Sequence, residues 1–84
     1  MQSPGASLHS PDYARFRAVL VDARHTAGLT QVQLATALRR PQSFVSKVES
    51  GERRLDVPEF VALARALRVD PLVLMRRYLK AIAR

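Results

Sequence analysis

The sequence predicts an all-α fold of five helices, and three observations lead to that prediction. Apolar residues recur at spacings of three and four along most of the chain. No segment alternates apolar and polar residues with a period of two, so no sheet is expected. Residues typical of helix starts and stops interrupt the pattern at short intervals. The 84 residues make one small domain, close to the lower size limit for independent stability, which favours a partner chain.

The first helix is predicted to run from Ser10 to about Ala27. The Ser10 side chain can accept a hydrogen bond from the first turn, and Pro11 suits the first helical position. Gly28 is placed to end the helix in the left-handed conformation. Residues 1–9 contain Ser, Pro and Gly and are expected to form a flexible arm, which leaves residues 10–84 as the folded domain. One apolar face is expected from Tyr13, Phe16, Leu20, Ala23 and Ala27.

The second helix is predicted to be only about eight residues long. Thr30 and Gln33 match a capping box, and Leu29 and Leu34 occupy the two positions of a hydrophobic staple. Pro41 prevents continuation, because the residue before a proline is pushed out of the helical conformation. The buried face is expected to contain Leu34, Ala35 and Leu38.

The third helix is predicted from Gln42 to Ser50, ending at Gly51. At about 100° per residue, Val45 and Val48 fall on one side and anchor the helix. The opposite, polar side carries Gln42 at its leading tip, Ser43, Ser46, Lys47 and Ser50. Gln can pair with adenine, Lys can donate to guanine, and short Ser side chains let a helix approach bases closely. A helix of two turns does not hold itself together, so this one is expected to be held by its neighbours and presented to a DNA major groove.

Two further helices are predicted after a basic loop. Asp56 and Glu59 form another cap pattern at the start of the fourth helix, and Asp70 with Pro71 starts the fifth. The fourth is expected to bury Phe60, Leu63, Ala64 and Leu67. Apolar residues of the fifth helix, within residues 70–84, cover roughly half its circumference, which is more than one small core requires. A second subunit is therefore expected to contact Leu72, Met75, Tyr78, Leu79 and Ile82.

The charge of the chain favours a polyanionic partner. Fourteen Lys and Arg against seven Asp and Glu give a net charge of +7, which suits nucleic acid before an anionic membrane. Arg53 and Arg54 follow the third helix, in a loop that would run beside the DNA backbone, and Arg39 and Arg40 lie at the turn before it. We expect these four arginines to contact phosphates.

Several classes of function are excluded by composition. The absence of Cys excludes disulfides, thiol chemistry and Cys-type zinc sites. His9 and His25 are the only imidazoles, so no metal and no cofactor is expected. Neither an activated nucleophile nor a glycine-rich phosphate loop is present, and no enzyme activity is expected. The longest apolar run, residues 60–64, is too short to span a membrane, and a cytoplasmic, nucleoid-associated protein is expected.

Several short motifs, which together cover residues 24–72, resemble the XRE family of helix-turn-helix proteins, which includes phage repressors and Cro. The matching segments are Ala27-Gly-Leu-Thr-Gln31, Leu34-Ala35, Ser43-Phe-Val-Ser-Lys-Val-Glu49, Gly51 and Leu63-Ala-Arg-Ala-Leu-Arg-Val-Asp70. Each piece is weak by itself, but the combination is specific. The chain departs from the family where Gly often follows the second and fourth helices, because Arg39 and Arg68 stand there.

The resemblance implies roles for individual residues. Gln31 would contact phosphate and brace Gln42, which leads the recognition helix. Ser43 and Lys47 would be the other base readers, and Ser46 would contact a base or a phosphate. The usual buried ion pair between the first helix and the recognition helix would join Arg24 to Glu49. Phe44, on the flank of the recognition helix, is expected to pack against the second helix, and the alternative is contact with a thymine methyl group or a sugar.

These features predict a sequence-specific, double-stranded DNA-binding transcriptional regulator. A homodimeric repressor would read a two-fold operator whose half-sites lie about 34 Å apart. One alternative is an antitoxin that regulates its own operon with the same module. Another, from a different class, is a protein-interaction adaptor whose basic charge serves an acidic partner. The polar and basic reading face, in place of an apolar groove, argues against the adaptor.

Overall fold

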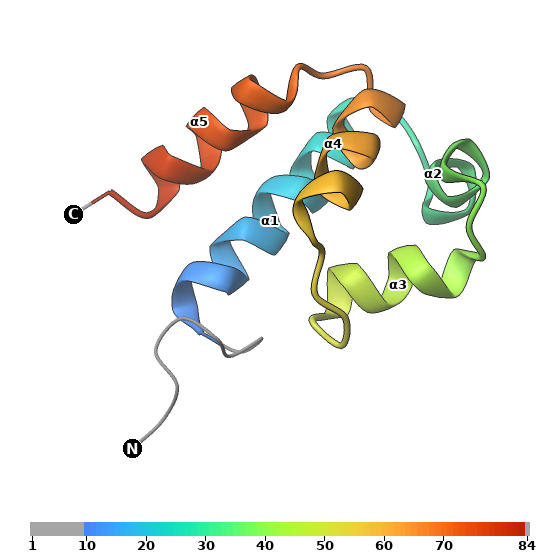
Figure 1. Ribbon diagram of the computed structural model, residues 1–84, viewed down its shortest axis with the longest axis horizontal. Helices are drawn as coiled ribbons and strands as arrows, with labels where there is room; N and C mark the ends of the chain where they lie inside the picture. Colours follow the sequence, from blue (N-terminus) through green and yellow to red (C-terminus); the bar gives the residue numbers. More distant parts are fainter. Residues whose placement is uncertain (1–9, 84) are drawn as a thin grey trace.

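The computed structural model describes residues 10–83, and within that range it contains five helices and no strand (Figure 1). The helices are α1 (Pro11–Thr26), α2 (Gln31–Leu38), α3 (Gln42–Ser50), α4 (Val57–Ala66) and α5 (Pro71–Ala81). The predicted all-α class is therefore confirmed. The predicted arm, residues 1–9, lies outside the described residues.

The helix starts follow from side chains that accept hydrogen bonds from first-turn amides. The Ser10 hydroxyl accepts from the Tyr13 amide at 3.0 Å. Thr30 with Gln33, and Asp56 with Glu59, both form complete capping boxes. The Asp70 carboxylate accepts from the Leu72 amide at 2.8 Å. These contacts are local in sequence, which is why the helix starts could be predicted.

Two helices end at an arginine in the left-handed conformation. Arg39 ends α2 with φ 56°, and Arg68 follows α4 with φ 60°. The next amide in each case closes the turn, because Arg40 N–H donates to the Ala35 carbonyl and Val69 N–H donates to the Ala64 carbonyl, both at 3.0 Å. The turns are thus the kind that Gly usually makes. The left-handed conformation of Arg39 therefore ends helix α2, one residue before Arg40, the residue whose conformation Pro41 restricts.

Replacing Arg68 by Gly is expected to raise the free energy of unfolding by about 0.5 to 1 kcal/mol. Left-handed backbone at a non-Gly residue costs about 1 to 2 kcal/mol, and the extra unfolded-state entropy of Gly offsets part of the gain. Chemical denaturation measures the change. Arg65→Gly, inside α4, is the matched control and should lose about 1 kcal/mol. A lower free energy of unfolding in Arg68→Gly would contradict the presence of backbone strain at Arg68.

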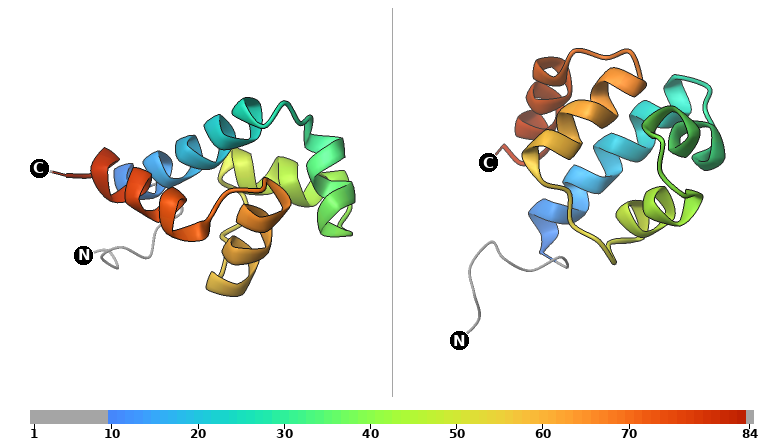
Figure 2. Two further views of the ribbon diagram at one scale, coloured as in Figure 1. Left: turned by 90° about the horizontal axis from the view of Figure 1, so that it is seen from above. Right: turned by 45° about the vertical axis from the view of Figure 1, so that its right-hand side comes forward.

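Helix α1 runs through the middle of the molecule, with α5 on one side and α3 on the other (Figures 1 and 2). Helix α2 packs on α3 and α4, and α4 packs on α5. The Phe16 ring on α1 contacts the Phe60 ring of α4 and the Tyr78 ring of α5, with ring centroids 5.7 and 5.3 Å apart. The core therefore joins the helix-turn-helix pair to α5 through α1.

Three apolar residues, and not two, anchor α3. Phe44 is buried together with Val45 and Val48, and it lines a small cavity with Leu38 of α2 and Ala62 of α4. The sequence named only the two valines as anchors, and the burial of Phe44 adds a third, in agreement with the expectation that Phe44 packs toward the second helix. Phe44 precedes Val48 by four residues, so the two side chains share one face of the helix. This wider anchor fixes a helix that is too short to be stable alone.

Candidate nucleic-acid interface

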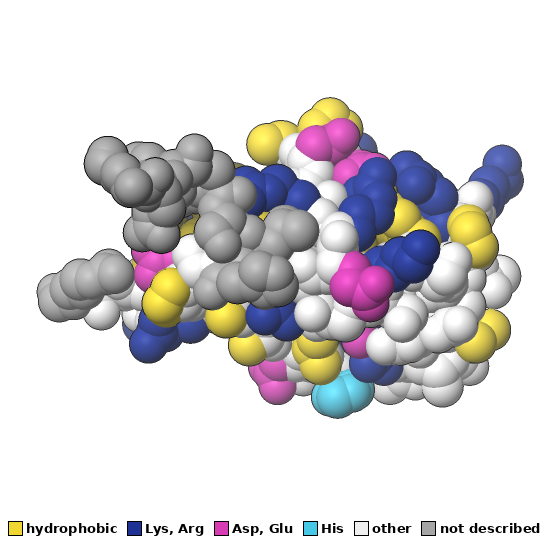
Figure 3. Space-filling view, turned by 90° about the horizontal axis from the view of Figure 1, so that it is seen from below, with side chains coloured by type: hydrophobic (Ala, Val, Ile, Leu, Met, Phe, Trp, Pro, Cys, Tyr) yellow, Lys and Arg dark blue, Asp and Glu magenta, His cyan; other side chains and the backbone are white. Residues whose placement is uncertain are grey.

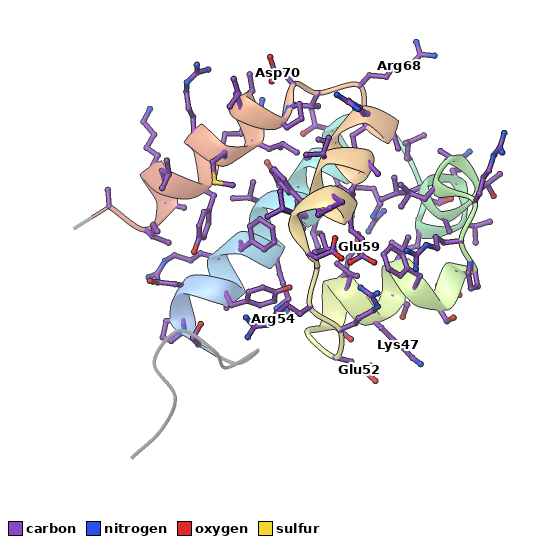
Figure 4. All side chains as sticks on the ribbon, in the orientation of Figure 1. Lys47, Glu52, Arg54, Glu59, Arg68 and Asp70 are labelled. Carbon is purple, nitrogen blue, oxygen red and sulfur yellow. The ribbon has the colours of Figure 1, made fainter. Side chains whose placement is uncertain are left out.

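The polar face predicted for α3 is on the surface of the structure. Gln42, Ser43 and Lys47 are exposed, and Ser46 is half-buried on the same side. Lys47 points away from the body of the molecule (Figure 4). Seen from below Figure 1, this region carries several Lys and Arg side chains among uncharged polar ones, with acidic groups between them (Figure 3). The structure thus brings all four predicted base-reading residues to one outward face.

A chain of side-chain amides fixes the leading end of α3. Gln42 donates through Nε2 to Gln31 Oε1 at 2.8 Å, and Gln31 donates through Nε2 to Glu49 Oε1 at 2.8 Å. The brace expected between Gln31 and Gln42 is therefore present. It also reaches Glu49, near the other end of α3, so one residue at the start of α2 orients both ends of the polar helix.

Arg24 and Glu49 form the expected ion pair between α1 and α3. Arg24 donates through Nε to Glu49 Oε2 at 2.7 Å and through Nη2 to Oε1 at 3.0 Å, and both side chains are only 10% exposed. A third donor, Nη1, reaches the Leu29 carbonyl at 2.8 Å. The hydrogen bond with Glu49 raises the pKa of Arg24. This two-pronged pair sets how α3 lies on α1, and so where the polar face points.

Arg17 supports the same junction and was missed from the sequence. Its Nη1 donates to the main-chain carbonyl of Glu49 at 3.1 Å. Its guanidinium also covers Gly51, where a Cβ would come within 3.1 Å of Arg17 Cζ. Gly51 has φ 88°, so both its backbone conformation and the close approach favour Gly. One signal was available, because Arg17 precedes Arg24 by two helical turns on the same face of α1.

The predicted phosphate-binding arginines have different surroundings. Arg39 and Arg54 are exposed, and Arg54 lies over the Tyr13 ring at 5.4 Å. Arg40 and Arg53 form ion pairs with Glu59, at 3.1 and 2.8 Å. The hydrogen bond from Arg53, helped by the Asp56 amide, lowers the pKa of Glu59 from 4.5 to about 2. From the sequence, Glu59 was interpreted only as a helix cap.

The predicted dimer residues at the C-terminal helix differ in their exposure. Leu72 and Leu79 are 63% and 55% exposed, and Met75 beside them is half-buried. Tyr78 is half-buried with its ring against Phe16 of the same chain, and Ile82 is also half-buried. Next to Leu72 and Met75, an apolar groove of about 280 Å³ reaches Val57 of α4, which is 74% exposed.

Neither a metal-ligand cluster nor a membrane-spanning helix is present in residues 10–83. Among residues 10–83, no three His, Asp or Glu side chains come together as metal ligands. No helix in the same range is both long and apolar enough to cross a membrane.

A family described as helix-turn-helix domain matches residues 15–77. An XRE-family like protein from Pseudomonas syringae pv. tomato str. DC3000 is 47% identical, with 84% of this chain and 89% of that chain covered and a TM-score of 0.73. The restriction-modification controller protein C.AhdI from Aeromonas hydrophila is 32% identical over 77% of this chain and 98% of its own, with a TM-score of 0.71.

A third similar structure contains DNA. It is the tetramer of the restriction-modification controller protein C.Esp1396I in complex with its natural 35 base-pair operator. The identity is 22%, the coverage is 90% of this chain and 100% of that chain, and the TM-score is 0.81, so this likeness bears on the fold alone. None of the curated proteins matches the chain.

Proposed function

We propose that this chain, which belongs to the XRE family of helix-turn-helix DNA-binding regulators, is a sequence-specific transcriptional regulator that reads double-stranded DNA in the major groove. The observation that carries the proposal is the polar face of α3, which is exposed yet braced at both ends through Gln31. A helix of nine residues held this firmly, with a face of Gln, Ser and Lys, suits base-edge recognition.

The proposed contacts divide by position around α3. Gln42, Ser43, Ser46 and Lys47 read bases, because they occupy the outward face. The residues around that face contact phosphates and set the register of α3 in the groove. These proposed phosphate contacts are Gln31, Arg39, Arg40, Arg53 and Arg54. Arginine suits this role, since its planar fork matches a phosphate in two places.

We propose further that the protein is a homodimeric repressor whose two subunits read a two-fold operator. The exposed apolar side chains of α5 support a second subunit there, because large apolar residues close together on a surface usually mark an interface. Leu72, Met75 and Leu79 form that face, continuous with the groove that reaches Val57.

Leu72→Glu is expected to raise the dimer dissociation constant by at least about tenfold, because a charge would lose its hydration in an apolar interface. Sedimentation velocity over a concentration series measures the change. Val32→Glu is the matched control, since Val32 is also apolar and 58% exposed but lies on α2. Equal dimerisation of the two variants would contradict the assignment of the interface to α5.

Selection of bound sequences from a random duplex pool tests the regulator directly. The expected result is an enriched site with two-fold symmetry and half-site centres about 34 Å apart, one helical turn of DNA. A pool that shows no enrichment would contradict sequence-specific reading. An enriched site without symmetry would contradict the dimer but not the reading of bases.

A further inference from the structure

Glu59 lies between two arginines that approach it from different parts of the chain. Arg53, from the loop after α3, donates through Nη1 to Oε1 at 2.9 Å and through Nη2 to Oε2 at 2.8 Å. Arg40, from the turn before α3, donates through Nη2 to Oε2 at 3.1 Å. Figure 4 shows Glu59 in the first turn of α4, close to α3. One carboxylate thus gathers the arginines that precede and follow the polar helix.

The guanidinium groups of Arg40 and Arg53 both lie over the ring of Phe44. The Arg40 and Arg53 Cζ atoms lie 4.3 and 4.8 Å from the centre of its ring, within the range of a cation-π contact. The Glu59 side chain is 15% exposed, whereas those of Arg40 and Arg53 are 43% and 38% exposed. The carboxylate is therefore mostly covered, and the two cations face outward.

This cluster borders the polar face of α3. Phe44 lies about 60° around the helix from Lys47, at about 100° per residue. A helix in a major groove has a phosphate strand along each flank, so the two arginines lie where one strand would pass. Arg53 also donates through Nη1 to the Arg54 carbonyl at 2.8 Å. Within the described residues its Nε makes no hydrogen bond, which leaves the Nε and Nη2 edge as a fork for a phosphate.

We propose that Glu59 is a positioning residue for DNA binding, which holds Arg40 and Arg53 ready as a pair of phosphate donors beside α3. The inference rests on the proposed function and adds to it a residue that need not touch DNA. An unheld arginine would have to be ordered on binding, which costs about two- to tenfold in affinity for each side chain. Because the arginines lower the pKa of Glu59 to about 2, its carboxylate stays charged at neutral pH and also in moderate acid, so the cluster persists there.

Glu59→Gln tests the proposal, because Gln can still accept the Asp56 amide in the capping box while it loses the charge that holds the arginines. Glu52→Gln is the matched control, since it removes the same charge close to α3 from a residue whose carboxylate accepts a hydrogen bond from the Ser50 hydroxyl at 2.9 Å. Affinity for the selected duplex is measured by fluorescence anisotropy at one salt concentration. Glu59→Gln should bind about five- to tenfold more weakly, whereas Glu52→Gln should bind as well as the unchanged protein or better.

A second background separates positioning from a loss of structure. When Arg40 and Arg53 are both replaced by Ala, the further change Glu59→Gln should no longer weaken binding. Thermal unfolding of each variant is followed in parallel. If Glu59→Gln does not fold, Glu59→Asp replaces it, because it keeps both arginines and the net charge but shortens the carboxylate's reach to them, and about threefold or more weaker binding is expected.

Three results would overturn the inference. Binding by Glu59→Gln that equals or exceeds that of Glu52→Gln would mean that Glu59 is neutral or competes with phosphate. Persistence of the Glu59→Gln effect without the two arginines would assign it to the fold. In these cases the unchanged protein still binds duplex and the proposed function stands. If the unchanged protein binds no duplex, both the inference and the proposed function fall.

Discussion

Arg24→Ala is expected to lower the free energy of unfolding by about 3 to 5 kcal/mol, because it leaves the Glu49 carboxylate buried without its cation. Both side chains are only 10% exposed, so water cannot replace the lost partner easily. Among the described residues, Gln31 would remain as the one side-chain donor to the Glu49 carboxylate. For a domain of this size, a loss of that magnitude is a large share of the total stability. Urea denaturation followed by circular dichroism measures it.

Arg15→Ala is the matched control for this prediction. Arg15 lies on the exposed side of the same helix, and its loss should change the stability by no more than about 0.5 kcal/mol. Replacing Arg24 and Glu49 together by Met should cost less than the sum of the two single changes, since no charge is then left buried. A loss below about 1 kcal/mol for Arg24→Ala would contradict a buried, structural pair.

Lys47→Ala is expected to remove about 1 to 3 kcal/mol of discrimination at one base position in each half-site. Lys47 is exposed and points away from the body of the molecule, so its ammonium group is placed to donate to a base edge (Figure 4). Selection from a random duplex pool with the variant should show that position relaxed and the others unchanged. Affinity for random duplex should fall only slightly, because most phosphate contacts remain.

Arg53→Ala is the contrasting variant. It should weaken binding to the selected and the random duplex by about the same factor and reduce the slope of log affinity against log salt by about 0.9. If Lys47→Ala and Arg53→Ala changed specific and random binding in the same proportion, the division into base and phosphate contacts would be contradicted.

The helices could be predicted closely because their signals are local. The hydroxyl of Ser10 and the capping boxes at Thr30 and Asp56 each join residues three positions apart. Gly51 at the end of α3 was predictable for the same reason. The left-handed turn at Arg39 was harder, because Arg rarely adopts that conformation and only the resemblance to the XRE family pointed to it.

Parts of the site could not be predicted because their contacts join distant residues. Arg17 meets Glu49 across 32 positions, and Arg40 meets Glu59 across 19. No local pattern records such pairs, which depend on how α1, α3 and α4 pack. Phe44 was different, since its spacing of four from Val48 already indicated a buried position. The Arg24 and Glu49 pair, 25 positions apart, is also distant in sequence, and the family resemblance was what predicted it.

A titration of the protein against random double-stranded DNA at increasing salt tests whether the α3 face binds duplex DNA. We expect measurable binding at low salt that weakens as salt rises. With contacts from Arg39, Arg40, Arg53 and Arg54, the slope of log affinity against log salt should be about −3 to −4 per subunit. An adaptor for an acidic protein partner would not require this behaviour. If no binding could be measured at low salt, duplex DNA binding by the α3 face would be contradicted.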